Sequence, residues 1–585
     1  MALHNLTGFL PIFEWLPNYQ RAALPGDIMA GVIVTIVLIP QAMAYAMLAG
    51  LPPQLGLYSC VLPIILYSAL GSSRVLAIGP VGLMSLMTAE ILAEMNPASR
   101  AEMILIGTTL ALLAGIVLLT MRLVRFGAIL NFLSHPVISG FTSASAILIA
   151  FSQLKHLLGL DMPRGLNLFE IIAFVARNST LINWMAAIIG VVSILIILWL
   201  RGPLNHLLAR LRLPAPLVNS IGKTGPLCVV VLSILITRQF ALDQQSALAI
   251  VGAIPKGLPT LAMPPVDWPF WKELLPGALL IAVIGFLESV SVGKALASRK
   301  RQKIDANQEL LGLGAANLGA AFSGGYPVAG GFGRSMVNFS SGANTPLASL
   351  ITAGLMALSL MFLTPFLYYL PRTTLAAIII VAVAGLIDFK TLRHTWNYDK
   401  ADATSLIATF IAVLTAGLEP GIAFGAALSI ALYLHRSSEP HMAIVGRVDD
   451  TEHFRNVERH PVTTYPHILA LRIDENLYFA NTNYLEDKIM NLVVDNKDVD
   501  HVVLVCSSIS FIDSSALESL EMIIERLRNA GVTLHFAEIK GPVMDHLGKT
   551  DFLSRLGDGK VFLSTHEAIE YLHKKSKEHG QKTAP

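Results

Sequence analysis

The sequence SGGYPVAGGFGRSMVNFSSGANTP, residues 323–346, lies among long apolar runs and decides how the surrounding chain must fold. It is rich in Gly, Ser and Asn, and it carries a single charge, Arg334. In a bilayer, a broken helix is tolerated only where its backbone is enclosed by protein or lines a cavity. An arginine at membrane depth is costly and usually marks a function. We therefore interpret this stretch as half of an anion site in a membrane transporter.

The composition supports a membrane location for most of the chain. Of its 585 residues, 54% are hydrophobic and 14% are charged, and the mean hydropathy is +0.61. Soluble domains carry about 25% charged residues. The net charge of +2 argues against a nucleic-acid partner, and the three cysteines, Cys60, Cys228 and Cys506, are too few and scattered for a disulfide framework or a zinc site. The first residues lack the pattern of a secretory signal, so insertion is expected to depend on the first membrane helix.

The composition changes once, near Ser437, from apolar runs to a polar, charge-rich segment. The expected organisation is a membrane domain at residues 1–436, a linker at 437–454, a soluble domain at 455–575 and a disordered tail at 576–585.

The membrane domain contains about fourteen candidate segments, because a bilayer core about 30 Å thick needs about 20 apolar residues per full helix. The long candidates are residues 27–49, 101–121, 129–153, 184–200, 274–297, 347–363, 373–387, 401–416 and 421–434. The shorter or interrupted ones are residues 55–70, 80–92, 227–236, 308–322 and 332–341.

Basic residues predict the orientation. If the N-terminus is cytoplasmic, the loops after even-numbered segments hold most of the basic residues: Arg122, Arg125, Arg201, Arg210, Arg212, Lys223, Arg299, Lys300, Arg301, Lys303, Lys390, Arg393 and Lys400. The opposite loops hold a sparser set, such as Arg100, Arg164, Lys256 and Arg372. The positive-inside rule then places both termini and the soluble domain in the cytoplasm.

Two glycine-interrupted segments occupy the third position of each putative half of seven segments. One begins near Gly79-Pro80-Val81-Gly82, where Pro80 is expected to start a half-helix because proline suits the first helical turn. The other begins near Gly333, Arg334 and Ser335. Paired breaks in two halves point to a transporter's binding site, and two helix N-termini with a guanidinium favour an anion. The structural alternative is a proline kink in one helix and a snorkelling arginine in the other.

Three further polar residues lie within apolar helices. Glu288 is near the middle of its segment, so it must be protonated, pair with a cation or pair with Arg334. It could carry a coupling proton or bind sodium, or it could be a structural hydrogen-bonding group. Gln41 and Tyr45 lie four residues apart and share one helix face. They suit a cavity wall, and they suit interhelical hydrogen bonds equally well.

The soluble domain alternates strand-like and helical stretches. HILALRI (467–473), DHVVLVCS (500–507) and VTLHFAEI (532–539) are expected strands, with helices at residues 484–494 and from about 515 onward. This alternation predicts an α/β domain with a sheet covered by helices. Asp513, Ser514 and Ser515 stand where they could cap a helix N-terminus. No credible nucleophile–base arrangement or metal-spaced His/Cys cluster is found in the sequence, so we do not expect an enzyme.

The chain resembles the sulfate permease (SulP, or SLC26) family of anion transporters over nearly its whole length. The resemblance rests on DIMAGVIVTIVLIPQAMAYAMLAGLPPQLGLYS (27–59), LGSSRVLAIGPVGLMSLM (70–87), FLESVSVGKALA (286–297) and GGYPVAGGFGRSMVN (324–338). The tail is similar to a STAS domain, with FIDSSALESL (511–520) at its helix-capping loop. The resemblance implies a seven-plus-seven inverted repeat, divided into core and gate, that works as a homodimer by an elevator-like motion.

The resemblance also assigns roles to residues. It implies an anion site at Gln41, Tyr45, Val81 beside the Pro80 turn, Gly333 and Arg334, with Glu288 at the position linked to cation coupling. Many members have Ser where this chain has Gly333, so a hydroxyl is missing from the expected site. Ser514 matches a position that is phosphorylated in related bacterial proteins, although the usual DSSG is DSSA here. It is a candidate regulatory residue.

The expected function is secondary active transport of an inorganic oxyanion, sulfate first, coupled to protons or sodium across the plasma (inner) membrane. Bicarbonate, a C4-dicarboxylate or anion exchange are alternatives within transport. A nucleobase symporter would share the fold, and a STAS-based membrane signalling protein is an alternative of another class. No cofactor is expected beyond coupling H⁺ or Na⁺. The expected partners are the anion, the lipid bilayer, a second copy of the chain and a cytosolic regulator at the STAS domain.

Overall fold

The structure is a computed structural model that describes residues 10–127, 134–163, 166–204, 224–449 and 451–582. The predicted start of the segment at 129 and the loop residues Arg164, Arg210, Arg212 and Lys223 lie outside these ranges. The chain divides into two compact units, Met1–Ser429 and Ile430–Pro585.

Each of the fourteen expected membrane segments has a helical counterpart. In the first half these are α3 (Leu24–Leu48), α4 with α5 (Pro53–Tyr58 and Leu62–Leu70), α6 (Gly82–Met95), α7 (Arg100–Leu123), α8 (His135–Ser152), α11 (Trp184–Arg201) and α14 (Gly225–Gln239). In the second half they are α16 (Trp268–Arg299), α17 (Ala306–Phe322), α18 (Phe332–Ser340), α19 (Leu347–Phe362), α20 (Arg372–Ala384), α22 (Lys400–Ala416) and α23 (Leu418–Ser438).

Shorter elements connect these helices. They are α2 (Ile12–Trp15), η1 (Arg21–Ala23), α9 (Leu154–Leu157), α10 (Leu168–Arg177), η3 (Ser179–Leu181), α15 (Leu242–Gln245), η4 (Thr364–Leu367) and α21 (Phe389–Tyr398). By length and apolar composition, eight helical spans in the described part of the chain are able to cross a membrane. The third helix of each half, α6 and α18, is not among them, as a half-helix requires.

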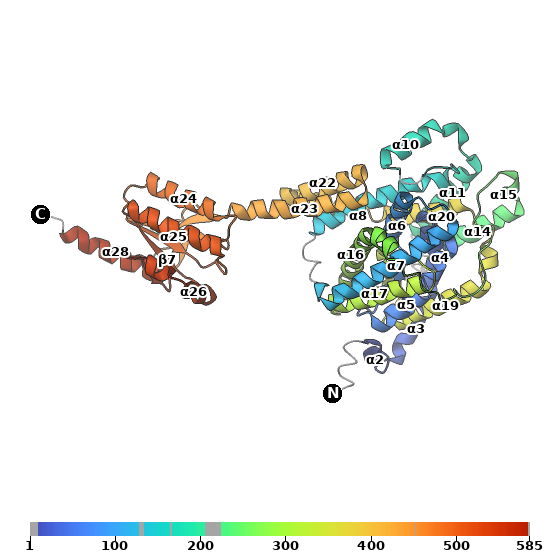
Figure 1. Cartoon of the computed structure of the whole chain (residues 1–585), viewed down its shortest axis with the longest axis horizontal. Coiled ribbons are helices and arrows are strands. Elements are labelled where there is room, and N and C mark those ends of the chain that lie inside the picture. The colour runs from blue at the N-terminus through green and yellow to red at the C-terminus, as the bar shows by residue number, and fades with distance from the viewer. Residues whose placement is uncertain (1–9, 128–133, 164–165, 205–223, 450, 583–585) are drawn as a thin grey trace. The chain divides into compact units, whose positions relative to one another are not determined.

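The helices of the first unit form two packed groups. In one group α17 lies along α5 and α7, α16 packs on α7, and α19 packs on α3. The neighbouring runs of α7 and α17 are visible in Figure 1. In the other group α22 packs on α8, and α11 packs on both α14 and α20. Each group thus combines helices from both halves of the chain, which is the division into core and gate that the resemblance implied.

Two buried carboxylates fix the first group of helices. The Glu309 side chain on α17 is fully buried, and it accepts hydrogen bonds from the Tyr67 hydroxyl (2.6 Å) and from the backbone N–H groups of Ser72 and Ser73 (2.8 and 3.0 Å). The Asp27 carboxylate on α3 accepts bonds from the backbone N–H groups of Asn344 and Thr345, just before α19. Such charge-assisted bonds hold sequence-distant segments in fixed register.

The second unit is an α/β domain. Its strands are β3 (Met442–Arg447), β4 (Phe454–Asn456), β5 (Ile468–Ile473), β6 (His501–Val505), β7 (Thr533–Ala537) and β8 (Val561–Phe562). They form one sheet in the order β4-β3-β5-β6-β7-β8, in which β5 to β8 are parallel and β3 is antiparallel to both neighbours. The helices are α24 (Thr482–Asp495), α25 (Ser514–Asn529), α26 (Gly541–Leu547), α27 (Phe552–Arg555) and α28 (Thr565–Lys582).

Both faces of this sheet are buried, because residues alternate between the faces of a strand. Leu469 and Leu471 of β5 pack in one apolar cluster with α24 and α25, whereas Ile468 and Ala470 pack in another with α28. This arrangement confirms the predicted sheet covered by helices.

Two predicted boundaries were wrong. The interval 437–454, expected to be a linker, contains β3, which pairs with both β4 and β5. Its short apolar core MAIV is flanked by polar residues and does not stand out in composition. Within 576–585, expected to be a disordered tail, α28 continues to Lys582. The residues of α28 that pack in the apolar core, Ala568, Ile569 and Leu572, lie earlier in the helix.

Candidate functional site

The two half-helices start next to each other. The strands β1 (Ile78–Gly79) and β2 (Ala329–Gly330) precede α6 and α18, and they pair antiparallel with Ile78 opposite Gly330. Gly79 has φ +152°, a backbone conformation that side-chain-bearing residues rarely adopt. The glycine-rich sequence therefore permits the two extended segments before α6 and α18 to hydrogen-bond to each other, which satisfies backbone groups that a continuous helix would otherwise pair.

Val81 and Gly331 are the N-cap residues, and both are extended. The first intrahelical hydrogen bonds of the two helices run from Ser85 N–H to the Val81 carbonyl and from Ser335 N–H to the Gly331 carbonyl. The N–H groups before these have no acceptor within their helix, so each start offers donors and a positive dipole end to an anion. Pro80 was expected to begin the first half-helix, and this was wrong by two residues. Its carbonyl is engaged by Arg334, and α6 begins at Gly82.

Side chains of α18 tie it to the segment before α6. The Ala77 N–H donates to Ser335 Oγ (2.9 Å), and Asn338 Nδ2 donates to the Val75 carbonyl (3.0 Å). Ser335 is fully buried, so its hydroxyl serves this backbone contact. Its role is to position the two helix starts.

Arg334 completes the connection. It is only 4% exposed. Its Nε and Nη2 atoms donate to the Ala77 carbonyl (3.3 and 3.2 Å), and Nη1 donates to the Pro80 carbonyl (3.0 Å). The guanidinium thus brings a fixed positive charge to the point where both half-helices begin, while backbone carbonyls hold its orientation. This geometry excludes the snorkelling alternative.

A cavity of about 630 Å³ lies in front of these helix starts. Helices α3, α6, α8, α11, α14, α16, α18 and α20 contribute to its walls. Among its polar lining residues are Gln41, Tyr45, Thr142, Ser145, Arg201, Glu288, Arg334 and Ser340. The Tyr45 ring reaches the start of α6, because a Cβ added to Gly82 would lie 3.3 Å from its Cε1 atom.

Glu288 enters this cavity from α16. Its Oε2 atom is buried and has no hydrogen-bond partner within the described residues. Glu288 and Arg334 interact electrostatically, but the printed hydrogen bonds of Arg334 go to backbone carbonyls. A buried carboxylate oxygen without a partner is costly unless a proton or cation reaches it.

The structure brings most of the predicted site residues together around this cavity. Gln41, Tyr45, Val81, Gly333, Arg334 and Glu288 all line the cavity. Pro80 and Ser335 are buried and are absent from the described lining. The residues missed were Arg201, Thr142 and Ser145. Thr142 and Ser145 lie three residues apart on one face of α8, a signal that could have placed them. Arg201 ends an apolar run and was interpreted as a loop charge.

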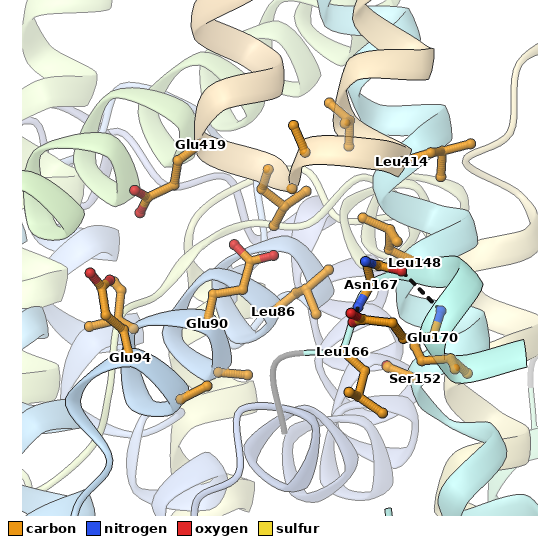
Figure 2. A pocket seen from close by; sticks show the side chains of 18 of the residues that line it. Leu86, Glu90, Glu94, Leu148, Ser152, Leu166, Asn167, Glu170, Leu414 and Glu419 are labelled. Carbon is orange, nitrogen blue, oxygen red and sulfur yellow. Dashed lines mark hydrogen bonds between the residues drawn. The ribbon is translucent and has the colours of Figure 1, made fainter. Parts of the chain in front are cut away.

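A second cavity, of about 700 Å³, has a different character. Figure 2 shows Glu90 and Glu94 of α6 and Glu419 of α23 around one open space, with Glu170 held in a capping box by Asn167. Helices α3, α6 and α8 line both cavities. Tyr45 and Leu83 line the first cavity, whereas Leu48 and Leu86 line the second. The described lining of the second cavity includes four glutamates and no half-helix start, so the first cavity is the candidate anion site.

In the second unit, Asp513 is the N-cap of α25, and its Oδ1 accepts from the Ala516 N–H (2.7 Å). Ser514 is the first residue of the helix and is exposed. The cap is therefore the aspartate, and Ser514 is left accessible at the loop.

Comparisons with known proteins agree with this architecture. The sequence pattern of the Sulfate permease family matches residues 24–409, and that of the STAS domain matches residues 460–568. The chain is 37% identical over 575 residues to the chloroplastic sulfate transporter 4.1 of Arabidopsis thaliana, covering 96% of this chain and 82% of that one. It is 31% identical over 565 residues to a probable sulfate transporter of Mycobacterium tuberculosis, covering 96% and 98%.

The fold also matches a solved structure. It is similar to murine Solute Carrier 26 family member A9, an anion transporter in the inward-facing state, with a TM-score of 0.87. The match covers 98% of this chain and 95% of that chain at 24% identity, so it concerns the fold. The family pattern covers most of the membrane unit, and the relatives match over nearly the whole chain. With the paired half-helices, these matches show that the chain belongs to the sulfate permease family and carries a C-terminal STAS domain.

Proposed function

We propose that the protein is a secondary active transporter of inorganic oxyanions, with sulfate as its substrate, and that it has no enzymatic activity. The observation that carries this proposal is the pair of half-helix starts held together by Arg334 at the wall of the first cavity. Backbone N–H groups, two positive dipole ends and a guanidinium converge there, and this combination recognises an anion. The named sulfate transporters among the relatives support the choice of sulfate.

In the proposed mechanism, the oxyanion binds between the starts of α6 and α18, where Gln41 and Tyr45 of α3 also line the cavity. Glu288 binds the coupling proton or Na⁺, which removes or balances its negative charge next to the bound anion. The loaded helices α6 and α18, together with the group that contains α3 and α16 on which they pack, then move against the other group in an elevator-like step.

The proposed transporter also has a location, an oligomeric state and an orientation. We place it in the plasma (inner) membrane as a homodimer with both termini in the cytoplasm, where basic loop residues such as Arg299 and Lys300 would lie. The STAS domain would meet a cytosolic regulator, and the exposed Ser514 is the candidate modification position. A phosphate there would lie at the N-terminus of α25, where negative charge is favourable.

The test is uptake by the purified full chain in liposomes. Labelled sulfate, bicarbonate and succinate are each supplied with an imposed proton gradient, an imposed Na⁺ gradient, or neither. We expect sulfate accumulation that depends on one gradient. Uptake of bicarbonate or succinate without uptake of sulfate would show that sulfate is not the substrate and would identify the transported anion instead. Movement only against a trans anion would make the protein an exchanger, and absence of all transport would favour a signalling role for the STAS domain.

A further inference from the structure

Arg201 is the last residue of α11 and lines the same cavity as Arg334. Its Nη1 atom donates to the Val381 carbonyl of α20 at 3.4 Å, and Val381 lines the cavity too. Arg201 therefore belongs to the wall formed by α11 and α20, whereas Arg334 belongs to the wall formed by α6 and α18. Tyr45 interacts electrostatically with both arginines and with Glu288.

The charge of the cavity follows from these residues. Within the described lining, the charged side chains are Arg201, Arg334 and Glu288. With Glu288 ionised, they sum to one positive charge, and with Glu288 protonated or paired with a cation they sum to two. A dianion in a weakly screened cavity is best balanced by two positive charges. Without Arg201, a dianion would remain unbalanced even when Glu288 is neutral.

We propose that Arg201 is a specificity-determining residue that supplies the second positive charge and thereby selects divalent over monovalent oxyanions. This inference rests on the proposed function, because it concerns the substrate of the same cavity. Coulomb energy is linear in the charge of the anion. If loss of Arg201 weakens binding of a monovalent anion by a given factor, it should weaken binding of a dianion of the same shape by about the square of that factor.

Sulfate and perchlorate make a matched pair of probes, since both are tetrahedral and differ in charge. The full chain is purified as wild type, Arg201→Gln, Arg201→Lys and Arg372→Gln. The last is the control, because Arg372 also donates to a backbone carbonyl (Ile250, 3.1 Å) and does not belong to the described lining of the cavity. Thermal stabilisation is titrated with each anion at constant ionic strength, and sulfate uptake is measured in liposomes.

We expect Arg201→Gln to raise the half-saturating concentration about tenfold for perchlorate and about a hundredfold for sulfate. Arg201→Lys should keep the wild-type ratio between the two anions, and Arg372→Gln should change neither constant. Equal factors for both anions in Arg201→Gln, or no change, would overturn the role of Arg201. A wild-type chain that neither binds nor carries sulfate would instead overturn the proposed function, and with it the divalent substrate.

A second route does not depend on folding of the glutamine variant. In Arg201→Cys, the charge is restored after folding by a thiol reagent that adds an ammonium group, and it is reversed by one that adds a sulfonate. The wild type with the same reagents controls for Cys60, Cys228 and Cys506, of which Cys60 and Cys506 are buried. The ammonium adduct should recover sulfate binding selectively, and the sulfonate adduct should not. Identical effects of both adducts would contradict the proposal.

Discussion

The Nη1 atom of Arg334 donates a 3.0 Å hydrogen bond to the Pro80 carbonyl, so a side chain of one half-helix holds the backbone that leads into the other. The two residues are 254 positions apart in the sequence. Together with the β1–β2 pair, this bond joins the two helix starts into one surface of the cavity wall.

Arg334→Ala is expected to abolish most sulfate uptake and to lower thermal stability. It removes a positive charge from the cavity, and it leaves the Ala77 and Pro80 carbonyls with fewer donors, at about 1–3 kcal/mol for each unsatisfied buried group. Arg334→Lys should recover only part of both, because an ammonium group lacks the planar fork that reaches two carbonyls. Uptake in liposomes and melting in detergent measure the effects. Unchanged uptake in Arg334→Ala would remove Arg334 from the site.

Glu288→Gln is expected to retain sulfate binding and to lose its dependence on the coupling gradient. The amide is neutral at every pH, so the cavity holds its more positive state without a proton or Na⁺. In a proton-coupled wild type, binding should strengthen as pH falls, since protonation removes a negative charge beside the anion. Sulfate uptake is recorded against imposed pH and Na⁺ gradients, with Glu94→Gln in the second cavity as the matched control. If sulfate uptake by Glu288→Gln still depends on the gradient, the coupling ion binds at a residue other than Glu288.

The sequence predicts the helices of the membrane unit and most of the residues that line the candidate site, because both leave local signals. Apolar length marks the long helices, and the glycine-rich breaks at Gly79 and Gly331 mark the half-helices. Arg201 could not be assigned in the same way. Its approach to the cavity depends on how the end of α11 packs against α20, a contact between residues 180 positions apart. Likewise, β3 pairs with strands on either side of it in the sheet, and its own sequence is too short to indicate them.

Gly333→Ser is expected to be tolerated, because a Cβ added at Gly333 meets no atom within 4 Å. The new hydroxyl would face the cavity that Gly333 lines and could donate to the anion, so the half-saturating sulfate concentration should stay equal or fall. Gly79→Ala is the contrasting variant. There φ is +152° and the added Cβ would lie 3.3 Å from Nη2 of Arg334, so stability and uptake should both fall. Melting temperature and sulfate titration separate the two outcomes. A destabilised Gly333→Ser would contradict the open space at that position.

His535 of β7 is expected to make the STAS domain less stable in mild acid. It is 2% exposed, and burial, followed by the nearby His501, Lys575 and Lys560, lowers its pKa from 6.5 to about 3. Its Nδ1 accepts from the Lys560 N–H (3.1 Å), so the neutral ring carries its proton on Nε2, facing His501 Nδ1 at 3.2 Å. A second proton would have to displace the Lys560 contact.

The sign of the pH effect follows from that lowered pKa. Between pH 6.5 and 3, the unfolded chain binds a proton at His535 that the folded domain does not, so stability falls as pH decreases through this window. Amide exchange of β7 in the full chain, corrected for intrinsic rates, should therefore accelerate by up to about tenfold per pH unit below 6.5. His535→Gln keeps an acceptor for Lys560 and should remove this component, whereas His546→Gln, at an exposed histidine, should not. Equal acceleration in wild type and His535→Gln would show that other groups carry the acid sensitivity of the sheet.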